Sequence, residues 1–150
     1  MLNGIHHIAY VVADLDDSLS TFEHLFEAEP IFRYRRDDDF VLETALYLLG
    51  DHYIEFISPI SENGWAHEYL AENGEGFFHI GYEVEDLDAA IRSLREVGVE
   101  FVTDEPQAGV GHRWEVITLA TEETVVPTQL VQDDRSDRTD FPTVDDEELP

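Results

Sequence analysis

A repeat spaced by 72 residues is the feature that most constrains how this chain can fold. When the sequence is shifted by that spacing, residues 7–16 (HIAYVVADLD) lie over residues 79–88 (HIGYEVEDLD). Seven of the ten pairs are identical, and the exceptions are Ala9/Gly81, Val11/Glu83 and Ala13/Glu85. Self-similarity at a fixed period indicates duplicated structural units. The sequence therefore predicts two homologous halves with the same order of elements.

Each half begins with an apolar strand that leads into an Asp-rich helix start. Aspartate side chains accept hydrogen bonds from the free N–H groups of a first helical turn and sit well beside its dipole. Apolar residues then recur at helical spacing in both halves. Gly98 is placed to follow the C-terminus of the second helix. The predicted first strands are residues 5–12 and 77–84, and the candidate caps are Asp14 or Asp16, and Asp86 or Asp88.

Three further strands are predicted in each half, at about 30–36, 40–49 and 52–58, and at about 99–103, 113–119 and 125–131. Each half is then a βαβββ module, and the fold class is α+β. The modules span about residues 4–61 and 76–132, with a linker at about 62–75 that holds one short helix. We expect residues 1–132 to form a single domain, a size that suits this chain length.

The composition restricts the environment and the partners more than the activity. The 150 residues include 35 acidic residues, eight arginines, no lysine and no cysteine, and the formal net charge is −27. A surface this acidic is a poor partner for nucleic acid or anionic membranes. The absence of cysteine excludes disulfides and thiolate metal sites. Since the sequence also lacks a long apolar run and a secretory signal, we expect a cytoplasmic location.

The charge further favours a salt-rich cytoplasm. Like charges repel one another in the compact state at low salt. Molar salt shortens the Debye length to about 3 Å and relieves most of that repulsion. The last residues, 133–150 (DDRSDRTDFPTVDDEELP), are acidic and have little that could be buried. We expect them to form a disordered acidic tail.

Each half also offers one histidine and one side-chain oxygen that could bind a metal. The first strands contribute His7 and His79, and the last strands contribute Glu55 and Gln129. Glu55 alternates with apolar neighbours, and a core-facing carboxylate is costly unless it is paired or bound to a cation. His6 has no histidine counterpart and should face away from His7, because successive strand residues point to opposite faces. An N2O2 set of this kind suits cobalt, zinc, nickel, manganese or iron better than calcium.

These motifs give the chain a resemblance to the vicinal oxygen chelate superfamily, which covers residues 4–132. The segments HHIAYVVADLDDS, YIEFISP and FFHIGYEVEDLDAAIRSLREVGVEFVTDEP carry it. Within the superfamily, SPISENGWAHEYLAENGEGFFHIGYEVEDLDAAI and GVEFVTDEPQAGVGH resemble the methylmalonyl-CoA epimerase family most. The resemblance implies a cupped, paired mixed β-sheet around a divalent metal and a homodimer. It places His7, Glu55, His79 and Gln129 on the four ligand positions.

The same resemblance implies a proton transfer alpha to the carbonyl of an acyl-CoA thioester. It assigns the role of catalytic base to Glu43, and the 72-residue spacing leads from there to Glu115 as a candidate second acid. The epimerases carry a glutamate at the fourth ligand position, where this chain has Gln129, an amide that exchanges no proton. Arg113 is a candidate for binding the CoA phosphates, together with Arg33, Arg35 and Arg36.

Two other functions stay open at this level. A glyoxalase I-type isomerase acting on a thiol hemithioacetal also carries a glutamate at the second ligand position, as Glu55 does here. A non-catalytic protein of the same fold that binds or sequesters a small molecule would need the pocket but no base. An extradiol dioxygenase requires two histidines and a glutamate in the fourth position, and Gln129 fits it least well.

Overall fold

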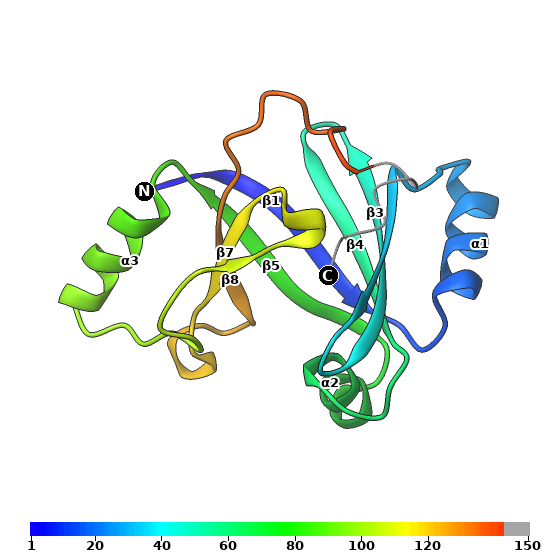
Figure 1. Ribbon diagram of the computed structural model, residues 1–150, viewed down its shortest axis with the longest axis horizontal. Helices are drawn as coiled ribbons and strands as arrows, with labels where there is room; N and C mark the ends of the chain where they lie inside the picture. The colour runs from blue at the N-terminus through cyan, green and yellow to red at the C-terminus, as the bar shows by residue number, and fades with distance from the viewer. Residues whose placement is uncertain (143–150) are drawn as a thin grey trace.

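The computed structural model describes residues 1–142, which form one eight-stranded mixed sheet with helices outside it (Figure 1). The first half contains β1 (Leu2–Val11), α1 (Leu15–Phe26), β2 (Phe32–Asp37), β3 (Val41–Leu49) and β4 (His52–Pro59). The linker contains α2 (Trp65–Asn73), and the second half contains β5 (Gly76–Val84), α3 (Leu87–Glu96), β6 (Gln107–Ala108), β7 (Glu115–Thr118) and β8 (Thr128–Gln132). The predicted α+β class is confirmed. No helix within residues 1–142 combines the length and apolarity needed to cross a membrane.

The two halves meet along β1 and β5, which lie antiparallel in the middle of the sheet order β2-β3-β4-β1-β5-β8-β7-β6. In each half the last strand runs parallel to the first: β4 pairs with β1, and β8 pairs with β5. The helices α1 and α3 lie at opposite ends of the molecule (Figure 1). The repeat in the sequence is thus a repeat in space, with an approximate twofold axis between the two central strands.

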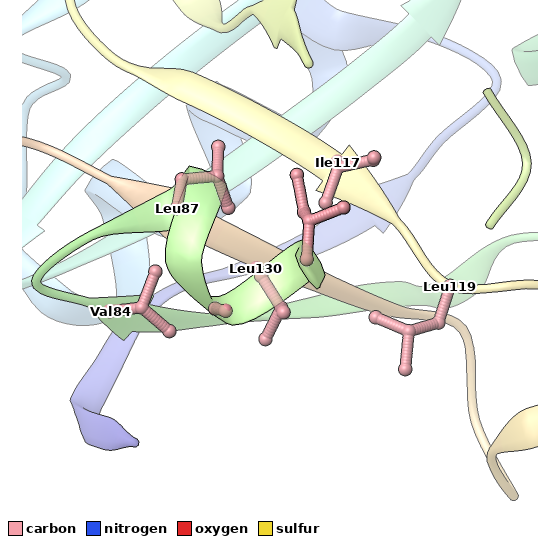
Figure 2. Close-up of a cluster of buried hydrophobic side chains, with 7 residues drawn as sticks. Val84, Leu87, Ile117, Leu119 and Leu130 are labelled. Atoms are coloured by element: carbon pink, nitrogen blue, oxygen red, sulfur yellow. The ribbon is translucent and has the colours of Figure 1, made fainter. Parts of the chain in front are cut away.

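Both of the outer helices begin as the sequence predicts. The side chains of Asp14 and Asp86 accept hydrogen bonds from the backbone N–H groups of Asp17 and Ala89. Each helix covers an apolar cluster on its own half. Figure 2 shows the second of these, in which Leu87 of α3 packs among residues of three strands and the loop after β7, with the labelled members Val84, Ile117, Leu119 and Leu130.

The second half departs from the predicted strands in one segment. Residues 99–103 were expected to form a strand, but only the bridge between Phe101 and Leu119 is present there. The polar sequence Thr103-Asp104-Glu105-Pro106 follows at once, and proline cannot donate to a ladder hydrogen bond. The edge strand therefore starts later and is reduced to β6.

The C-terminal segment is the main correction to the sequence-based prediction. Residues 133–142 were expected to be disordered, yet they cross from the end of β8 to the first half (Figure 1). Asp133 is buried, and the Phe141 ring stacks on Phe32 of β2 with ring centroids 4.8 Å apart. The stacked Phe141 ring and the buried Asp133, which contacts His6 of β1, together anchor this segment to the first half. The remainder of the predicted tail, residues 143–150, lies outside the described residues.

Candidate metal centre

Four side chains converge on the axis between the halves. His7 lies on β1, Glu55 on β4, His79 on β5 and Gln129 on β8. The strand pairing brings them together symmetrically: Ala9 lies opposite Glu55 and His79, while Gly81 lies opposite Gln129 and His7. Each half therefore contributes one imidazole and one oxygen from equivalent positions, as the sequence predicted.

The distances describe a compact set of ligand atoms. His7 Nε2 lies 3.0 Å from His79 Nε2 and 3.1 Å from Gln129 Oε1. One ligand atom each from His7, Glu55 and His79 lies within 4.8 Å of the others. Tetrahedral zinc ligands at ordinary bond lengths lie about 3.3 Å from one another. The separations are therefore close to those that a divalent ion would require.

Burial makes these groups costly without a cation. His7, Glu55 and His79 are only 2%, 5% and 6% exposed. Desolvation raises the pKa of Glu55 to about 8 and lowers the pKa of His79 to about 3. The pKa of His7 is also lowered, by burial and by the neighbouring imidazoles. Deprotonated imidazoles are the form that binds metals.

Glu55 is the strongest sign that the set fits a metal. Within residues 1–142 its carboxylate has no hydrogen-bond or ion-pair partner, although it is buried. A carboxylate in that position is favourable when a positive charge lies beside it. Two neutral imidazoles, a carboxylate and an amide oxygen form a ligand set that suits a divalent ion of the first transition row or zinc.

Gly81 allows the His7 ring to occupy its place. A Cβ atom at Gly81 would lie 2.5 Å from His7 Cε1, well inside van der Waals contact. The corresponding residue of the first half is Ala9, which is fully buried. The repeat thus has glycine rather than alanine at position 81 because the His7 ring occupies the space that a methyl group would need.

The metal set lies in a cavity of about 630 Å³, which is within the range of small-molecule sites. Both halves line it. Besides the four candidate ligands, its walls include polar side chains from Tyr34, Arg36, Asp38, Thr44 and His112, and apolar ones from Leu42, Trp65, Phe78 and Val116. The cavity thus has a cationic side chain and several hydrogen-bonding groups around the four candidate ligands.

Glu43 and Glu115 do not enter this cavity. Leu42 and Thr44 line it, so Glu43 points to the opposite face of β3, where it lies 3.4 Å from Arg35 and its side chain is 30% exposed. Val116 and Thr118 line the cavity from β7, and Glu115 is exposed on the other face. The 72-residue spacing does hold between these strands. The spacing relates two glutamates that both face away from the cavity. The prediction that Glu43 and Glu115 lie in the site is therefore corrected.

Arg113 also lies away from the cavity lining. Its guanidinium Nε donates to the backbone carbonyl of Asp140. Among the arginines considered for CoA phosphates, Arg36 lines the cavity and forms an ion pair with Asp38 at 3.0 Å. Among the described residues, the arginine that lines the cavity is therefore Arg36, on strand β2 of the first half.

His6 was not expected to contact the metal set, but the structure places it against His7. A bulge in β1 leaves His6 without a cross-strand partner between Ile5 and His7. Its ring is fully buried, with Nδ1 2.8 Å from His7 Nδ1 and Nε2 2.8 Å from Asp133. Strict alternation predicted that His6 and His7 point to opposite faces of the strand. The bulge changes this, and a bulge cannot be recognised from residue alternation alone.

Comparison with known proteins agrees with this architecture. The model of the Glyoxalase/Bleomycin resistance protein/Dioxygenase superfamily matches residues 6–118, about three quarters of the chain. The chain belongs to this superfamily. Among curated members, the ethylmalonyl-CoA/methylmalonyl-CoA epimerase of Cereibacter sphaeroides is 29% identical over 111 residues, covering 73% of this chain and 82% of the relative. The mitochondrial methylmalonyl-CoA epimerase of Dictyostelium discoideum is 23% identical over 112 residues, covering 72% and 65% of the two chains.

Solved structures of the superfamily share the fold. Methylmalonyl-CoA epimerase from Mycobacterium tuberculosis superimposes with a TM-score of 0.81 at 23% identity, covering 89% of this chain and 90% of that one. A methylmalonyl-CoA epimerase in complex with methylmalonyl-CoA and NH4+ superimposes with a TM-score of 0.76 at 24% identity, covering 95% and 100%. The superfamily fold thus extends over nearly the whole described chain.

Proposed function

We propose that this protein is a metal-dependent epimerase that moves a proton alpha to the carbonyl of an acyl-CoA thioester, with methylmalonyl-CoA as substrate. The observation that carries the proposal is the buried Glu55, which lies beside His7 and His79 at the wall of the cavity and has no polar partner within the described part of the chain. Support comes from the epimerases among its relatives, one of which is solved in complex with methylmalonyl-CoA.

His7, Glu55, His79 and Gln129 would hold the divalent ion. When bound there, such an ion acts as a Lewis acid toward substrate oxygens and stabilises the negative charge of an enolate. The ligand set suits cobalt, zinc, nickel, manganese or iron. Arg36 lines the same cavity and would provide positive charge for an anionic group of the substrate.

The proton carriers are proposed from the groups that line the cavity. Epimerisation requires one group to remove the α-proton and another to return a proton to the opposite face. Glu55 is a carboxylate in the cavity, and its counterpart Gln129 has no proton to exchange. We therefore assign one transfer to Glu55 and the second to His112, which lines the cavity from the other half.

Deuterium exchange tests this assignment directly. Metal-loaded protein in D2O at high salt should exchange the α-proton of methylmalonyl-CoA and interconvert its two epimers. With His112→Gln, we expect exchange from only one epimer and loss of interconversion, because a single carrier serves a single face. With Glu55→Gln, which also loses a metal ligand, we expect the same result when the assay is run at a zinc concentration that saturates the weakened site. Interconversion that persists in either variant would overturn the assignment of that residue. Absence of exchange in the wild type would overturn the epimerase proposal.

The same preparation distinguishes a glyoxalase-type activity. Methylglyoxal and a thiol would then yield a thioester, which absorbs in the ultraviolet and can be followed continuously. We expect no such product. Its formation, without exchange of the α-proton of methylmalonyl-CoA, would assign the site to the isomerisation of hemithioacetals.

We also propose that the protein works as a homodimer in a salt-rich cytoplasm. The support is the net charge of −27 with no lysine, and the family resemblance for the dimer. Raising KCl from 0.1 to 2 M should increase the melting temperature by screening the repulsion. Light scattering at high salt should give twice the mass of one chain. A melting temperature that is flat across this range, or a monomer mass, would refute the corresponding statement.

A further inference from the structure

The bulge in β1 brings two imidazole rings into contact beside the metal centre. His6 Nδ1 lies 2.8 Å from His7 Nδ1, and the ring planes are nearly perpendicular at 86°. His7 Nε2, on the other side of its ring, faces His79 and Gln129. His6 therefore touches the one nitrogen of His7 that does not face the candidate metal position.

His6 is itself fixed by a carboxylate on the C-terminal segment. Its Nε2 lies 2.8 Å from Oδ2 of Asp133, whose side chain is fully buried. Asp133 also accepts hydrogen bonds from the guanidinium groups of Arg135 and Arg138, both at 2.8 Å. Arg138 in turn pairs with Glu83 of β5. Two guanidinium groups thus balance two carboxylates, so the cluster is neutral without a charge on His6.

The hydrogen-bond roles in this chain follow from charge balance. The Asp133 carboxylate can only accept, so His6 Nε2 carries a proton and donates it. A neutral imidazole has one N–H, so His6 Nδ1 is an acceptor. For the 2.8 Å contact to be a hydrogen bond, His7 Nδ1 must then be the donor. That leaves a lone pair on His7 Nε2, which faces the acceptor Gln129 Oε1 at 3.1 Å. Two acceptors repel each other at this distance unless a cation lies between them.

We propose that Asp133 and His6 are positioning residues that hold His7 as its Nδ1–H tautomer, with Nε2 ready to bind a divalent cation. Partners of this kind orient metal-binding histidines and typically change metal affinity by about 10–100-fold when removed. The arrangement has no equivalent in the second half, where Phe78 replaces His6. The inference rests on the metal site of the proposed function, but its tests do not depend on turnover.

The tautomer of His7 can be measured in the wild-type protein. Long-range proton–nitrogen correlation spectra of metal-free protein labelled with 15N-histidine distinguish a protonated from an unprotonated ring nitrogen. We expect His7 with a proton on Nδ1 and none on Nε2, and His6 with a proton on Nε2. A proton on Nε2 of His7 would overturn the proposal, whatever the activity of the loaded enzyme.

Substitutions then test whether the pair affects metal binding. His6→Phe should weaken zinc affinity by about 10–100-fold, and His6→Asn, which keeps an acceptor next to His7, should recover part of the loss. Asp133→Asn should weaken it as well, whereas the control Asp137→Asn, in the same segment but exposed, should change it less than about twofold. Competition titration with a chelator measures affinity, and circular dichroism and the melting temperature report folding.

The outcomes separate positioning from simple packing. Equal affinity in folded His6→Phe and wild-type protein, with the His7 tautomer unchanged, would refute the proposal. If His6→Phe does not fold, the wild-type spectrum and His6→Asn decide. Retained zinc binding and the expected tautomer in a protein that fails to exchange the α-proton would refute the proposed function and leave this inference standing.

Discussion

The two halves share a backbone and differ in chemistry. The register around the axis is the same in both: His7 opposes Gly81 as His79 opposes Ala9. Yet the oxygen ligand is a carboxylate in the first half and an amide in the second. Strand pairing depends on backbone hydrogen bonds that every residue except proline can form, so duplication preserves it while individual side chains diverge. The axis is therefore symmetric in geometry and asymmetric in charge.

The largest expected effect comes from exchanging the two oxygen ligands between the halves. Glu55→Gln removes the one negative charge of the candidate ligand set, and we expect zinc affinity to fall by at least about 100-fold. Gln129→Glu adds a charge, and affinity should rise. The double variant Glu55→Gln/Gln129→Glu should bind zinc within about tenfold of the wild type. An unchanged affinity in Glu55→Gln would show that the carboxylate does not bind the ion.

The charge of the first half should also give the metal-free protein a distinctive pH dependence. The pKa of Glu55 is raised to about 8 in the folded chain, against about 4.3 in an unfolded one. Between these values the folded state binds more protons, so the free energy of unfolding should fall as pH rises. Below about 4.3 the effect is absent, and above about 8 it is complete.

Urea unfolding of chelator-treated protein at high salt measures this effect. The comparison with metal-free Glu55→Gln isolates it from the other carboxylates and histidines, which both proteins share. We expect the difference in stability between the two to grow across pH 5 to 8 in favour of the variant. A constant difference across that range would contradict the assigned burial of an unpartnered carboxylate.

A steric comparison uses the two small residues at the axis. Gly81→Ala should push the His7 ring from its place, cost about 1–3 kcal/mol of stability and weaken zinc binding. The matched change Ala9→Gly should cost about 1 kcal/mol through backbone entropy and leave zinc affinity nearly unchanged. Thermal melts and zinc titrations of both variants check this. Equal zinc affinities in the two would show that His7 is not confined by Gly81.

The smallest effects are expected outside the cavity. Glu43→Gln and Glu115→Gln should each leave α-proton exchange within about threefold of the wild type. Loss of the exposed pair between Glu43 and Arg35 should cost no more than about 1 kcal/mol. A loss of turnover by two or more orders of magnitude in Glu43→Gln, with zinc binding intact, would restore the role inferred from the sequence.

The sequence predicted the parts of this molecule that depend on periodicity. The repeat, the capping residues Asp14 and Asp86, the fold class and the meeting of His7, Glu55 and His79 all follow from spacing and alternation. What escaped prediction depends on local irregularity. The bulge at His6 breaks the alternation of faces. Glu43 lies in a regular strand, and alternation alone does not show which of its two faces meets the cavity.

The C-terminal segment escaped for a different reason. Its composition is that of a solvated acidic tail, and composition does not reveal that Asp133 meets two arginines and a histidine. Those contacts join residues up to 127 positions apart in the sequence. Long-range ion pairs of this kind have no local signature, so a prediction from residue content alone assigns such segments to disorder.

The shared register of β1 and β5 has an evolutionary consequence. Two separate copies of one half could also pair about a twofold axis, but identical chains must present identical residues on both sides. Such a pair could offer two carboxylates or two amides, never one of each. Joining the copies into one polypeptide lifts that restriction. Glu55 in one half with Gln129 in the other, and Ala9 in one half with Gly81 in the other, are combinations that a pair of identical chains could not offer.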